Sequence, residues 1–486
     1  MKPITLSQLR DILPGRPLTV APPQPNEILA VSTDSRLIEP SCLFVAIKGE
    51  NHDGHSHIEA AAAKGAIAIL VEHSGDDLQK LFSQGLPKNC YVYQVASTRL
   101  ALGRLAAFVR RGLQAKVVAV GGSNGKTSTK NLIHSVLAAR FSGTMSPKSF
   151  NNDIGVPTTI FAASSSDDFL VLELGTNHHG ELKPLSEMAQ PDIAVITFIS
   201  AEHLEGLGDL NGVRKEEASI TAGLKPTGLL VVNGDDPELR PLLATYPGKV
   251  VTFGFGADND LFATDIEITP AGTRFSLNAS RRDVFVPQLG RHAATNALAA
   301  IAVARRIGLS EDEIIAALAT AHSPDMRLQI QSGELPDGRG SVTILNDAYN
   351  ANPASVQAAL DTLLALPAGT PNAPARRIAV IGDMRELGEQ SDFYHLELGK
   401  KLARLERDIQ LFVLVGQQSK LIEQELLHDR VPASRIAHFE NSLAASLAAP
   451  GLLQANDLVL LKASRGIALE KVAAALKPAA ADRKVG

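Results

Sequence analysis

The chain has 486 residues, and because a single hydrophobic core rarely grows beyond about 250–300 residues, this length predicts two to four domains. Its 45% hydrophobic and 20% charged residues are typical of globular proteins, and its net charge of −5 is mild for this length. Because the sequence has no basic stripe, neither nucleic acid nor an anionic membrane surface is expected as a partner.

Neither secretion nor membrane insertion is expected. Residues 1–18 lack the apolar core of a signal peptide, and no run approaches the roughly 18 apolar residues of a membrane span. Cys42 and Cys90 are too few for a disulfide framework or a zinc site, and both sit beside apolar runs. We therefore expect two small core residues in a cytoplasmic protein.

The predicted elements divide into three α/β domains. Residues 1–97 alternate short apolar runs with a helix that ends at Gly65, as in a small α/β module. Residues 98–322 begin with a helix and continue with unbroken Val, Ile and Leu runs, which suit a mainly parallel sheet covered on both faces. Residues 323–486 restart the strand–helix alternation and predict a Rossmann-like, doubly wound sheet.

Two local patterns add detail to the central domain. Residues 263–289 alternate apolar and polar side chains, which predicts a small antiparallel attachment to the parallel sheet. Ser310, followed three residues later by Glu313, predicts a capping box at the start of a helix.

The stretch GGSNGKTST, residues 121–129, follows the strand KVVAV and predicts a phosphate-binding loop. A glycine-rich turn between a strand and a helix directs backbone N–H groups at one point, and the helix N-terminus adds partial positive charge. Lys126 supplies a point charge for the β- and γ-phosphates, and Thr127 supplies a hydroxyl for Mg²⁺. The loop residues expected to bind ATP are Gly122, Ser123, Asn124, Gly125, Lys126, Thr127 and Ser128.

The spacing G-x-x-G-K-T is two residues tighter than the common pattern G-x-x-x-x-G-K-[ST]. This variant resembles the loop of the Mur ligase family, ATP-dependent enzymes that join amino acids or peptides to a nucleotide-linked carboxylate. Other segments resemble the same family, in the same order, over nearly the whole chain. They are STDSR (32–36), CLFVAIKGENHDGH (42–55), SFNNDIGVP (149–157), ELGTNHHGE (173–181), AEHLEGLGDLNGV (201–213), GRHAATNALAA (290–300), LNDAYNANPAS (345–355) and KASRG (462–466).

Within the family, these segments are most similar to the ligases that join D-alanyl-D-alanine to UDP-N-acetylmuramoyl-tripeptide. The resemblance implies an ADP-forming ligase of peptidoglycan synthesis, and hence of cell-wall biogenesis, cell shape and cell division. It further implies ATP as a substrate, Mg²⁺ as a cofactor, an acyl-phosphate intermediate and a monomer. Residues 1–97 would bind the UDP substrate, 98–322 ATP and 323–486 the amine substrate.

The ends of two predicted strands carry candidate metal ligands. Glu173 lies at the end of the strand DFLVLEL, at the edge where ligands of open α/β sheets gather, and a carboxylate near Thr127 suits Mg²⁺. His203 lies in the loop after the strand DIAVITFI, and the resemblance implies that it ligates a second Mg²⁺. The candidate catalytic residues are Lys126, Glu173, His203 and Glu217.

Position 217 departs from the family pattern. Relatives carry a lysine fourteen residues after this histidine, carbamylated so that it serves the second Mg²⁺ as an anion, whereas this chain has Glu217 there. Lys215 lies about 200° around the helix from Glu217 and faces elsewhere. The hypothesis is that Glu217 supplies the negative charge directly, and the alternative is an exposed helical glutamate.

The remaining candidates rest on the resemblance. Asn296, in the first turn of a predicted helix, is expected to contact adenine, and Arg327 to reach the nucleotide phosphates. Asp347 is expected to touch ATP from the third domain when the domains close. The candidate substrate-binding residues are Thr33, Asp34, Ser35 and Arg36 for the uridine nucleotide, Asn151, Asn152, Asn177 and His178 around the tripeptide end, and Tyr349, Asn350 and Asn352 in the third domain.

Two alternative functions stay open. Family members that add the third peptide residue share the N-terminal module, but those that use diaminopimelate carry D-N-P-R, which this sequence lacks. A P-loop switch without ligase chemistry is the other alternative, although the N-K-x-D motif of a GTPase is also absent from the sequence. The sequence does not decide whether the third peptide residue is diaminopimelate or lysine, or which group accepts the proton of the amine.

Overall fold

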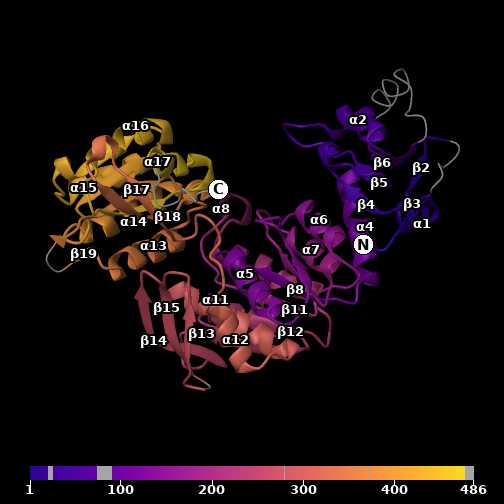
Figure 1. The fold of residues 1–486 in the computed structure, drawn as a ribbon, viewed down its shortest axis with the longest axis horizontal. Helices are drawn as coiled ribbons and strands as arrows, with labels where there is room; N and C mark the ends of the chain where they lie inside the picture. Colours follow the sequence, from indigo (N-terminus) through magenta and orange to yellow (C-terminus); the bar gives the residue numbers. More distant parts are fainter. Residues whose placement is uncertain (20–25, 74–89, 279, 371–372, 477–486) are drawn as a thin grey trace.

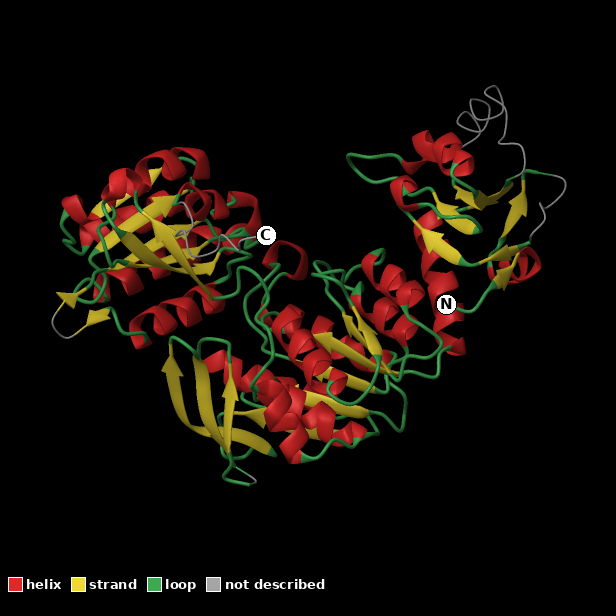
Figure 2. Ribbon diagram, viewed as in Figure 1, coloured by secondary structure: helices red, strands yellow, loops and turns green. Residues whose placement is uncertain are grey.

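The computed structural model describes residues 1–19, 26–73, 90–278, 280–370 and 373–476 and contains three α/β domains, the fold class that the sequence predicts. The central domain lies at the base, and the N-terminal and C-terminal domains rise from its two sides (Figure 1). Helices pack around the sheet in each domain (Figure 2). No helix in these described ranges is long and apolar enough to cross a membrane.

The N-terminal domain is built on a five-stranded sheet of order β2-β7-β6-β5-β4. Strands β4 to β7 pair in parallel, and β2 runs antiparallel to β7. Cys42 and Cys90 are free thiols buried in its core, as predicted. The elements are β1 (Ile4–Thr5), α1 (Leu6–Ile12), β2 (Gly15–Pro17), β3 (Glu27–Ile28), β4 (Ala30–Ser32), β5 (Cys42–Val45), α2 (Ile58–Ala63), β6 (Ala66–Val71) and β7 (Tyr91–Val95).

The central domain contains a nine-stranded sheet of order β16-β15-β14-β13-β12-β11-β8-β10-β9. Strands β8 to β14 pair in parallel, and β14 to β16 form the antiparallel attachment predicted for residues 263–289. The strands are β8 (Lys116–Gly121), β9 (Gly143–Met145), β10 (Phe169–Glu173), β11 (Ile193–Ile196), β12 (Leu229–Asn233), β13 (Lys249–Gly254), β14 (Leu261–Thr269), β15 (Gly272–Leu277) and β16 (Asp283–Val286). The helices are α4 (Thr98–Gly112), α5 (Lys126–Ala138), α6 (Gly155–Ala162), α7 (Leu182–Ala189), α8 (Leu204–Leu207), α9 (Leu210–Ala218), α10 (Leu239–Leu243), α11 (Arg291–Ile307) and α12 (Glu311–Leu318).

Helices cover both faces of the central sheet. Val118 and Val120 of β8 belong to one apolar cluster together with residues of α5 and α11. Val117 and Ala119 of the same strand belong to another cluster, together with residues of α4. Because successive side chains of a strand point to opposite faces, a strand covered on both sides must be apolar throughout, which explains the unbroken runs. The capping box predicted at Ser310 begins α12.

The C-terminal domain contains a six-stranded sheet of order β17-β18-β24-β21-β22-β23, in which β17 is antiparallel to β18 and the other pairs are parallel. Asp347 and Lys462 are register partners at the carboxyl ends of β18 and β24. The strands are β17 (Gln329–Glu334), β18 (Ser341–Asp347), β19 (Gly369–Thr370), β20 (Ala373–Pro374), β21 (Arg377–Gly382), β22 (Leu411–Val415), β23 (Ile436–Phe439) and β24 (Leu458–Lys462). The helices are α13 (Pro353–Ala365), α14 (Ser391–Arg404), α15 (Ser419–His428), α16 (Ser442–Leu452) and α17 (Glu470–Ala475).

Two leucines of α4 give a matched test of this packing. Leu102 is 0% exposed, whereas Leu100 is 69% exposed. Leu102→Ala should lower the unfolding free energy of the central domain by about 2–5 kcal/mol, because it leaves a cavity. Leu100→Ala should change it by less than about 0.5 kcal/mol. Hydrogen exchange of the β8 and β10 amides in urea measures both, and equal effects would contradict the packing described.

Candidate active site

The phosphate loop joins β8 to α5 through a turn that only glycine fits. Gly122 and Gly125 have φ angles of 117° and 90°, in the left-handed region. A side chain on Gly122 would collide with Thr197, and one on Gly125 would come within 2.6 Å of Asn296 Oδ1. The Lys126 ammonium donates to the carbonyls of Gly122, at 2.5 Å, and Ser123, at 3.0 Å. The loop therefore holds its lysine along its own backbone, beside the N-terminus of α5.

A cavity of about 660 Å³ opens beside this loop, a size in the range of small-molecule sites. Both the central and the C-terminal domain line it. Its polar lining residues include Asn124, Ser128, Asn296, Arg327, Asp347 and Lys462. The apolar part includes Phe255, Ile266 and Leu289. The cavity thus joins a phosphate-binding end to an apolar end that suits a flat ring.

Asn296 lies behind the loop, but not in the first turn of its helix as predicted. Helix α11 begins at Arg291 because Gly290, with a φ of 93°, starts it earlier than the sequence pattern indicated. Asn296 is therefore in the second turn, where its Oδ1 accepts a hydrogen bond from the Thr129 hydroxyl at 3.2 Å. It is 5% exposed and still lines the cavity.

Glu173 at the end of β10 is a buried carboxylate with two partners. Asn151 Nδ2 donates to its Oε1 at 3.2 Å, and Lys130 Nζ lies 3.2 Å from its Oε2. Both Lys130 and Glu173 are 1% exposed. Burial lowers the pKa of Lys130, and the charge of Glu173 opposes that shift. Sequence reasoning missed Lys130, although its place four residues after Lys126 puts both lysines on one helix face.

His203 is held between two carboxylates that sequence reasoning also missed. Its Nε2 lies 3.4 Å from Glu202 Oε1, and its Nδ1 lies 2.5 Å from Glu386 Oε2 of the C-terminal domain. Burial lowers the pKa of His203, but these carboxylates outweigh it and raise the pKa to about 9. Burial also raises the pKa of Glu202, but the charges of Lys126, His203 and Arg327 outweigh it, so the net shift is downward.

Glu217 lies beneath the phosphate loop and is 3% exposed, so it is not the exposed helical residue of the alternative interpretation. Its Oε2 accepts a hydrogen bond from the Gly122 N–H at 2.6 Å. Burial raises its pKa to about 7, although the charge of Lys126 and this hydrogen bond favour ionisation. Lys215 is exposed, so it faces away from the buried Glu217, as predicted.

The residues of the site suit a Mg²⁺ ion that binds together with a nucleotide. They suit it better than an ion held by protein ligands alone. No three His, Cys, Asp or Glu side chains converge as metal ligands within the described residues. However, Glu202 Oε2 is buried beside His203 and accepts no hydrogen bond within the described part of the chain. Because Mg²⁺ is usually held by one or two carboxylates together with phosphate oxygens and water, an incomplete protein cage is what this ion needs.

The C-terminal domain contributes residues of β18 and β24, the loop after β18, and Arg327, which precedes β17. Lys462 Nζ donates to Asp347 Oδ2 at 2.6 Å and to the carbonyl of Asn350 at 2.8 Å. The Arg327 guanidinium stacks 4.1 Å from the centre of the Tyr349 ring, a cation–π distance.

Two side-chain contacts connect that loop to the central domain. The Tyr349 hydroxyl lies 2.6 Å from that of Ser149. The side-chain amides of Asn124 and Asn352 bond each other at 3.0 and 3.2 Å. The phosphate loop therefore touches the C-terminal domain directly.

Comparison with known proteins decides the family. The Mur ligase family catalytic domain matches residues 27–110, the Mur ligase middle domain 120–304 and the glutamate ligase domain of Mur ligases 326–465. The UDP-N-acetylmuramoyl-tripeptide–D-alanyl-D-alanine ligase of Escherichia coli is 37% identical over 487 residues, 98% of each chain. The ligase of the same name from Bacillus subtilis is 33% identical over 470 residues, 96% of this chain and 97% of that one. The chain belongs to the Mur ligase family.

Solved structures agree with this assignment. The Mur ligase resembles the crystal structure of MurF from Acinetobacter baumannii with a TM-score of 0.84 and 30% identity, covering 98% of this chain and 99% of the other. It resembles MurF from Thermotoga maritima, solved in complex with ADP, with a TM-score of 0.77 and 26% identity, covering 92% and 97%. The three-domain α/β fold class is thereby confirmed.

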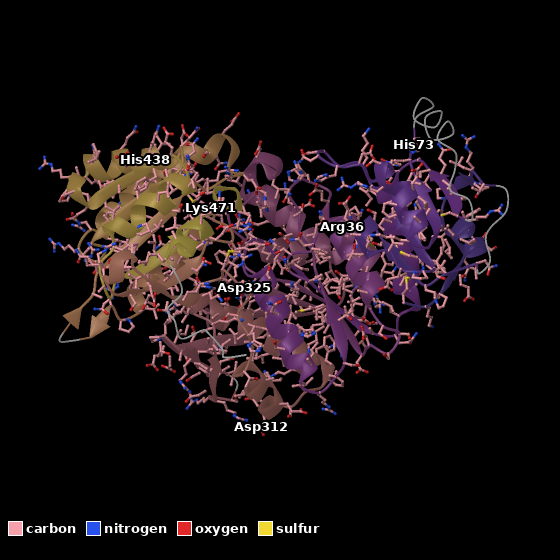
Figure 3. All side chains as sticks on the ribbon, turned by 45° about the horizontal axis from the view of Figure 1, so that its top comes forward. Arg36, His73, Asp312, Asp325, His438 and Lys471 are labelled. Atoms are coloured by element: carbon pink, nitrogen blue, oxygen red, sulfur yellow. The ribbon has the colours of Figure 1, made fainter. Side chains whose placement is uncertain are left out.

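Not every predicted residue of this Mur ligase lies near the phosphate loop. Thr33, Asp34, Ser35 and Arg36 belong to the N-terminal domain, and Figure 3 shows Arg36 well apart from Lys471 of the C-terminal domain. Arg36 Nη2 donates to Asp34 Oδ2 at 2.7 Å, and this pairing lowers the pKa of Asp34 to about 2. None of these four residues lines the cavity beside the phosphate loop.

Three of the predicted polar residues have local contacts of their own. Asn152 Oδ1 accepts hydrogen bonds from the N–H groups of Ile154 and Gly155, so it caps the turn before α6. His178 is exposed and lies 3.3 Å from Glu181. The Asn177 N–H donates to the same glutamate at 2.8 Å, and both residues pack against Gly206 of α8.

The raised pKa of Glu217 makes the stability of the ligand-free protein depend on pH. Between its ordinary value of 4.5 and about 7, the unfolded chain has released this proton and the folded chain retains it. Wild-type stability should therefore fall, relative to Glu217→Gln, by on the order of 3 kcal/mol as pH rises through that window. Urea unfolding of both proteins in EDTA buffer measures the difference, and a difference that stays constant would contradict it.

Proposed function

We propose that this Mur ligase joins D-alanyl-D-alanine to UDP-N-acetylmuramoyl-tripeptide, using ATP and releasing ADP and phosphate. One observation carries the assignment: the whole chain, through all three domains, matches ligases of this activity from several bacteria. The phosphate loop and the cavity beside it support the part of the assignment that concerns ATP, because ATP can bind there.

The cavity suggests how ATP is held. The phosphates lie on the loop from Gly122 to Ser128, where the backbone N–H groups and the N-terminus of α5 stabilise negative charge. Asn296 contacts the adenine end, Arg327 reaches the phosphates, and Asp347 reaches the nucleotide from the C-terminal domain. Lys462 orients Asp347, because it is a buried cation bonded to that carboxylate.

Thr127, Glu173 and His203 are the residues that would hold Mg²⁺, which neutralises phosphate charge when bound. The chain's own part in the reaction is positioning and electrostatics, as is usual in phosphoryl transfer. Lys126 and Arg327 stabilise the charge that develops while the tripeptide carboxylate attacks the γ-phosphate. The resulting acyl phosphate reacts with the dipeptide amine, forming the amide bond and releasing phosphate.

Docking of the C-terminal domain protects the acyl phosphate from water. The Asn124–Asn352 pair and the Ser149–Tyr349 contact close this domain over the loop. We assign the dipeptide to a second cavity of about 660 Å³, at the carboxyl ends of β21 to β24. Its lining combines Arg385 and Lys471 with carboxylates, which suits a zwitterion with a free amine and a free carboxylate.

The remaining assignments follow from the substrates. The N-terminal domain takes the UDP end of the acceptor, with the Asp34–Arg36 turn as its uridine-nucleotide candidate. Asn151, Asn177 and His178 lie near the tripeptide end, Tyr349 and Asn350 on the side of the C-terminal domain. The reaction takes place in the cytoplasm, where ATP and the nucleotide precursor are available, and a monomer suffices because one chain supplies every proposed residue.

Glu217 takes the place of the carbamylated lysine of its relatives in this proposal. Its burial under the loop and its bond to the Gly122 N–H support the role, since they place a carboxylate next to the phosphate site without chemical modification. The charge acts through the loop and Lys126, because Glu217 Oε2 is already bonded to the loop backbone.

Phosphate release tests the assignment. The wild-type enzyme should release phosphate from ATP only when both UDP-tripeptide and D-alanyl-D-alanine are present, whereas ATP turnover indifferent to both would indicate a nucleotide switch. Lys126→Ala should lower kcat by at least about 100-fold, as the loss of one charge-stabilising group does. Lys183→Ala, which removes an exposed lysine, is the matched control and should leave kcat unchanged. Assays with diaminopimelate- and lysine-containing tripeptides identify the third residue.

Bicarbonate tests the role of Glu217. Wild-type activity should be unaffected by thorough CO₂ removal, because a glutamate needs no carbamylation. Glu217→Lys should become bicarbonate-dependent, since it restores the lysine of the relatives. Rates measured in CO₂-free buffer with and without added bicarbonate decide the question. Wild-type activity that disappears without CO₂ and returns with bicarbonate would refute the role of Glu217.

A further inference from the structure

The two carboxylates that hold His203 come from different domains. Glu202 precedes His203 in the chain, whereas Glu386 belongs to the C-terminal domain, in the segment that follows β21. Glu386 Oε2 lies 2.5 Å from Nδ1, and Glu202 Oε1 lies 3.4 Å from Nε2. The imidazole thus has a carboxylate at each nitrogen, and the closer one crosses the domain boundary.

The segment around Glu386 is fitted closely against α8. The Glu386 carbonyl accepts a hydrogen bond from the Glu205 N–H at 3.3 Å, and Gln390 Nε2 donates to the Gly208 carbonyl at 3.2 Å. Gly388 lies so near that a side chain there would come within 3.1 Å of the Glu205 Cα. His203 and Glu386 both have positive φ angles, 53° and 65°. Such backbone strain in residues other than glycine persists only where the surroundings hold it, and it gathers at functional sites.

A histidine that binds a metal with one nitrogen usually donates the N–H of the other to a carboxylate, which fixes its tautomer and ring orientation. A carboxylate beside Nδ1 favours a proton on that nitrogen, so Nε2 is the nitrogen of His203 left for a cation. The same side carries Glu202, whose Oε2 is buried and accepts no hydrogen bond within the described ranges. Glu202 Oε2 and Nε2 therefore mark the place of the cation.

We propose that Glu386 is a positioning residue, supplied by the C-terminal domain, that orients His203 toward the cation accompanying ATP. The inference rests on the proposed role of His203 as a cation ligand. Because Glu386 reaches His203 only when the C-terminal domain is docked, the cation site is complete only in the docked arrangement. Docking and cation binding stabilise each other for that reason.

The test is the Mg²⁺ concentration needed for half-maximal binding of AMPPCP, a non-hydrolysable ATP analogue, to the full-length protein, measured by calorimetry. Glu386→Ala should raise it about 10-fold, the lower end of what losing such a carboxylate costs in metal affinity. Glu386→Gln should raise it less, because the amide keeps the shape of the side chain and a polar oxygen beside Nδ1 but loses the charge. His203→Gln with Glu386→Ala should give the value of His203→Gln alone, because Glu386 acts through His203.

Two neighbouring variants separate orientation of His203 from docking. Gln390→Ala removes a contact of the same segment without touching His203, and Glu389→Ala changes an exposed residue between them. Glu389→Ala should leave the Mg²⁺ requirement unchanged, and Gln390→Ala should raise it less than Glu386→Ala does, because it acts only through docking. The radius of gyration from small-angle X-ray scattering reports docking in each variant. A rise in Gln390→Ala equal to that in Glu386→Ala would mean that docking alone matters and would overturn the positioning role.

The outcomes also distinguish this inference from the function on which it rests. If His203→Gln leaves the Mg²⁺ requirement of AMPPCP binding unchanged, His203 is not a cation ligand and both proposals fail. If His203→Gln raises the requirement and Glu386→Ala does not, only the positioning role of Glu386 fails. Additive effects in the double variant would likewise refute it, since Glu386 would then act independently of His203.

Discussion

The hydrogen bond from the Gly122 N–H to the buried Glu217 carboxylate fixes the turn on which the site depends. This turn is too short to be stabilised by contacts within itself, so neighbouring elements must hold it in place. The Thr197 hydroxyl lies 2.9 and 2.7 Å from the carbonyl oxygens of Gly121 and Asn124 and shares its one hydrogen between them, which supports the other side of the turn. Asn296 closes it from behind, where only a glycine at position 125 fits.

Two of the contacts that the C-terminal domain makes with the central domain, one at the phosphate loop and one at His203, differ in chemistry. On the nucleotide side, the Asn124–Asn352 amide pair is neutral, and its loss or gain changes no charge. On the side of His203, the contact is an ion pair with Glu386. A polyanion that binds beside a neutral pair changes the energy of that pair little, whereas a cation that binds beside an ion pair changes its energy strongly. The two contacts are therefore suited to sense different parts of a metal–nucleotide complex.

Sequence patterns predicted the elements well and the interdomain contacts poorly. Unbroken apolar runs located β8, β10 and β11, because strands covered on both faces must be apolar throughout. The start of α11 was misplaced because a single residue, Gly290, determines it, and its φ of 93° has no periodic signal. Glu386 has no local pattern that marks it, since its partner lies 183 positions earlier in the chain and meets it only through domain docking.

The burial of Glu217 could not be read from the sequence either, since it sits beside Glu216 in a polar stretch of α9. Helical geometry predicted that Glu217 and Lys215 face different directions. It did not predict which of the two faces the protein interior. Burial followed from tertiary contacts: Glu216 accepts hydrogen bonds from the N–H groups of Gly180 and Leu182, which draws this face of α9 inward. The two adjacent acids are thus buried because backbone N–H groups from different segments donate hydrogen bonds to them.

The charges near the phosphate loop, His203 and Asp347 explain why a metal ion should accompany the nucleotide. The cations are Lys126, Lys130, Arg327 and Lys462, with His203 joining them below its raised pKa of about 9. The carboxylates are Glu173, Glu202, Glu217, Asp347 and Glu386. Because most of these charges are already paired within the protein, the site has little net positive charge to offer a triphosphate. A divalent ion that arrives with the nucleotide supplies that charge, whereas added lysines would repel one another before the nucleotide binds.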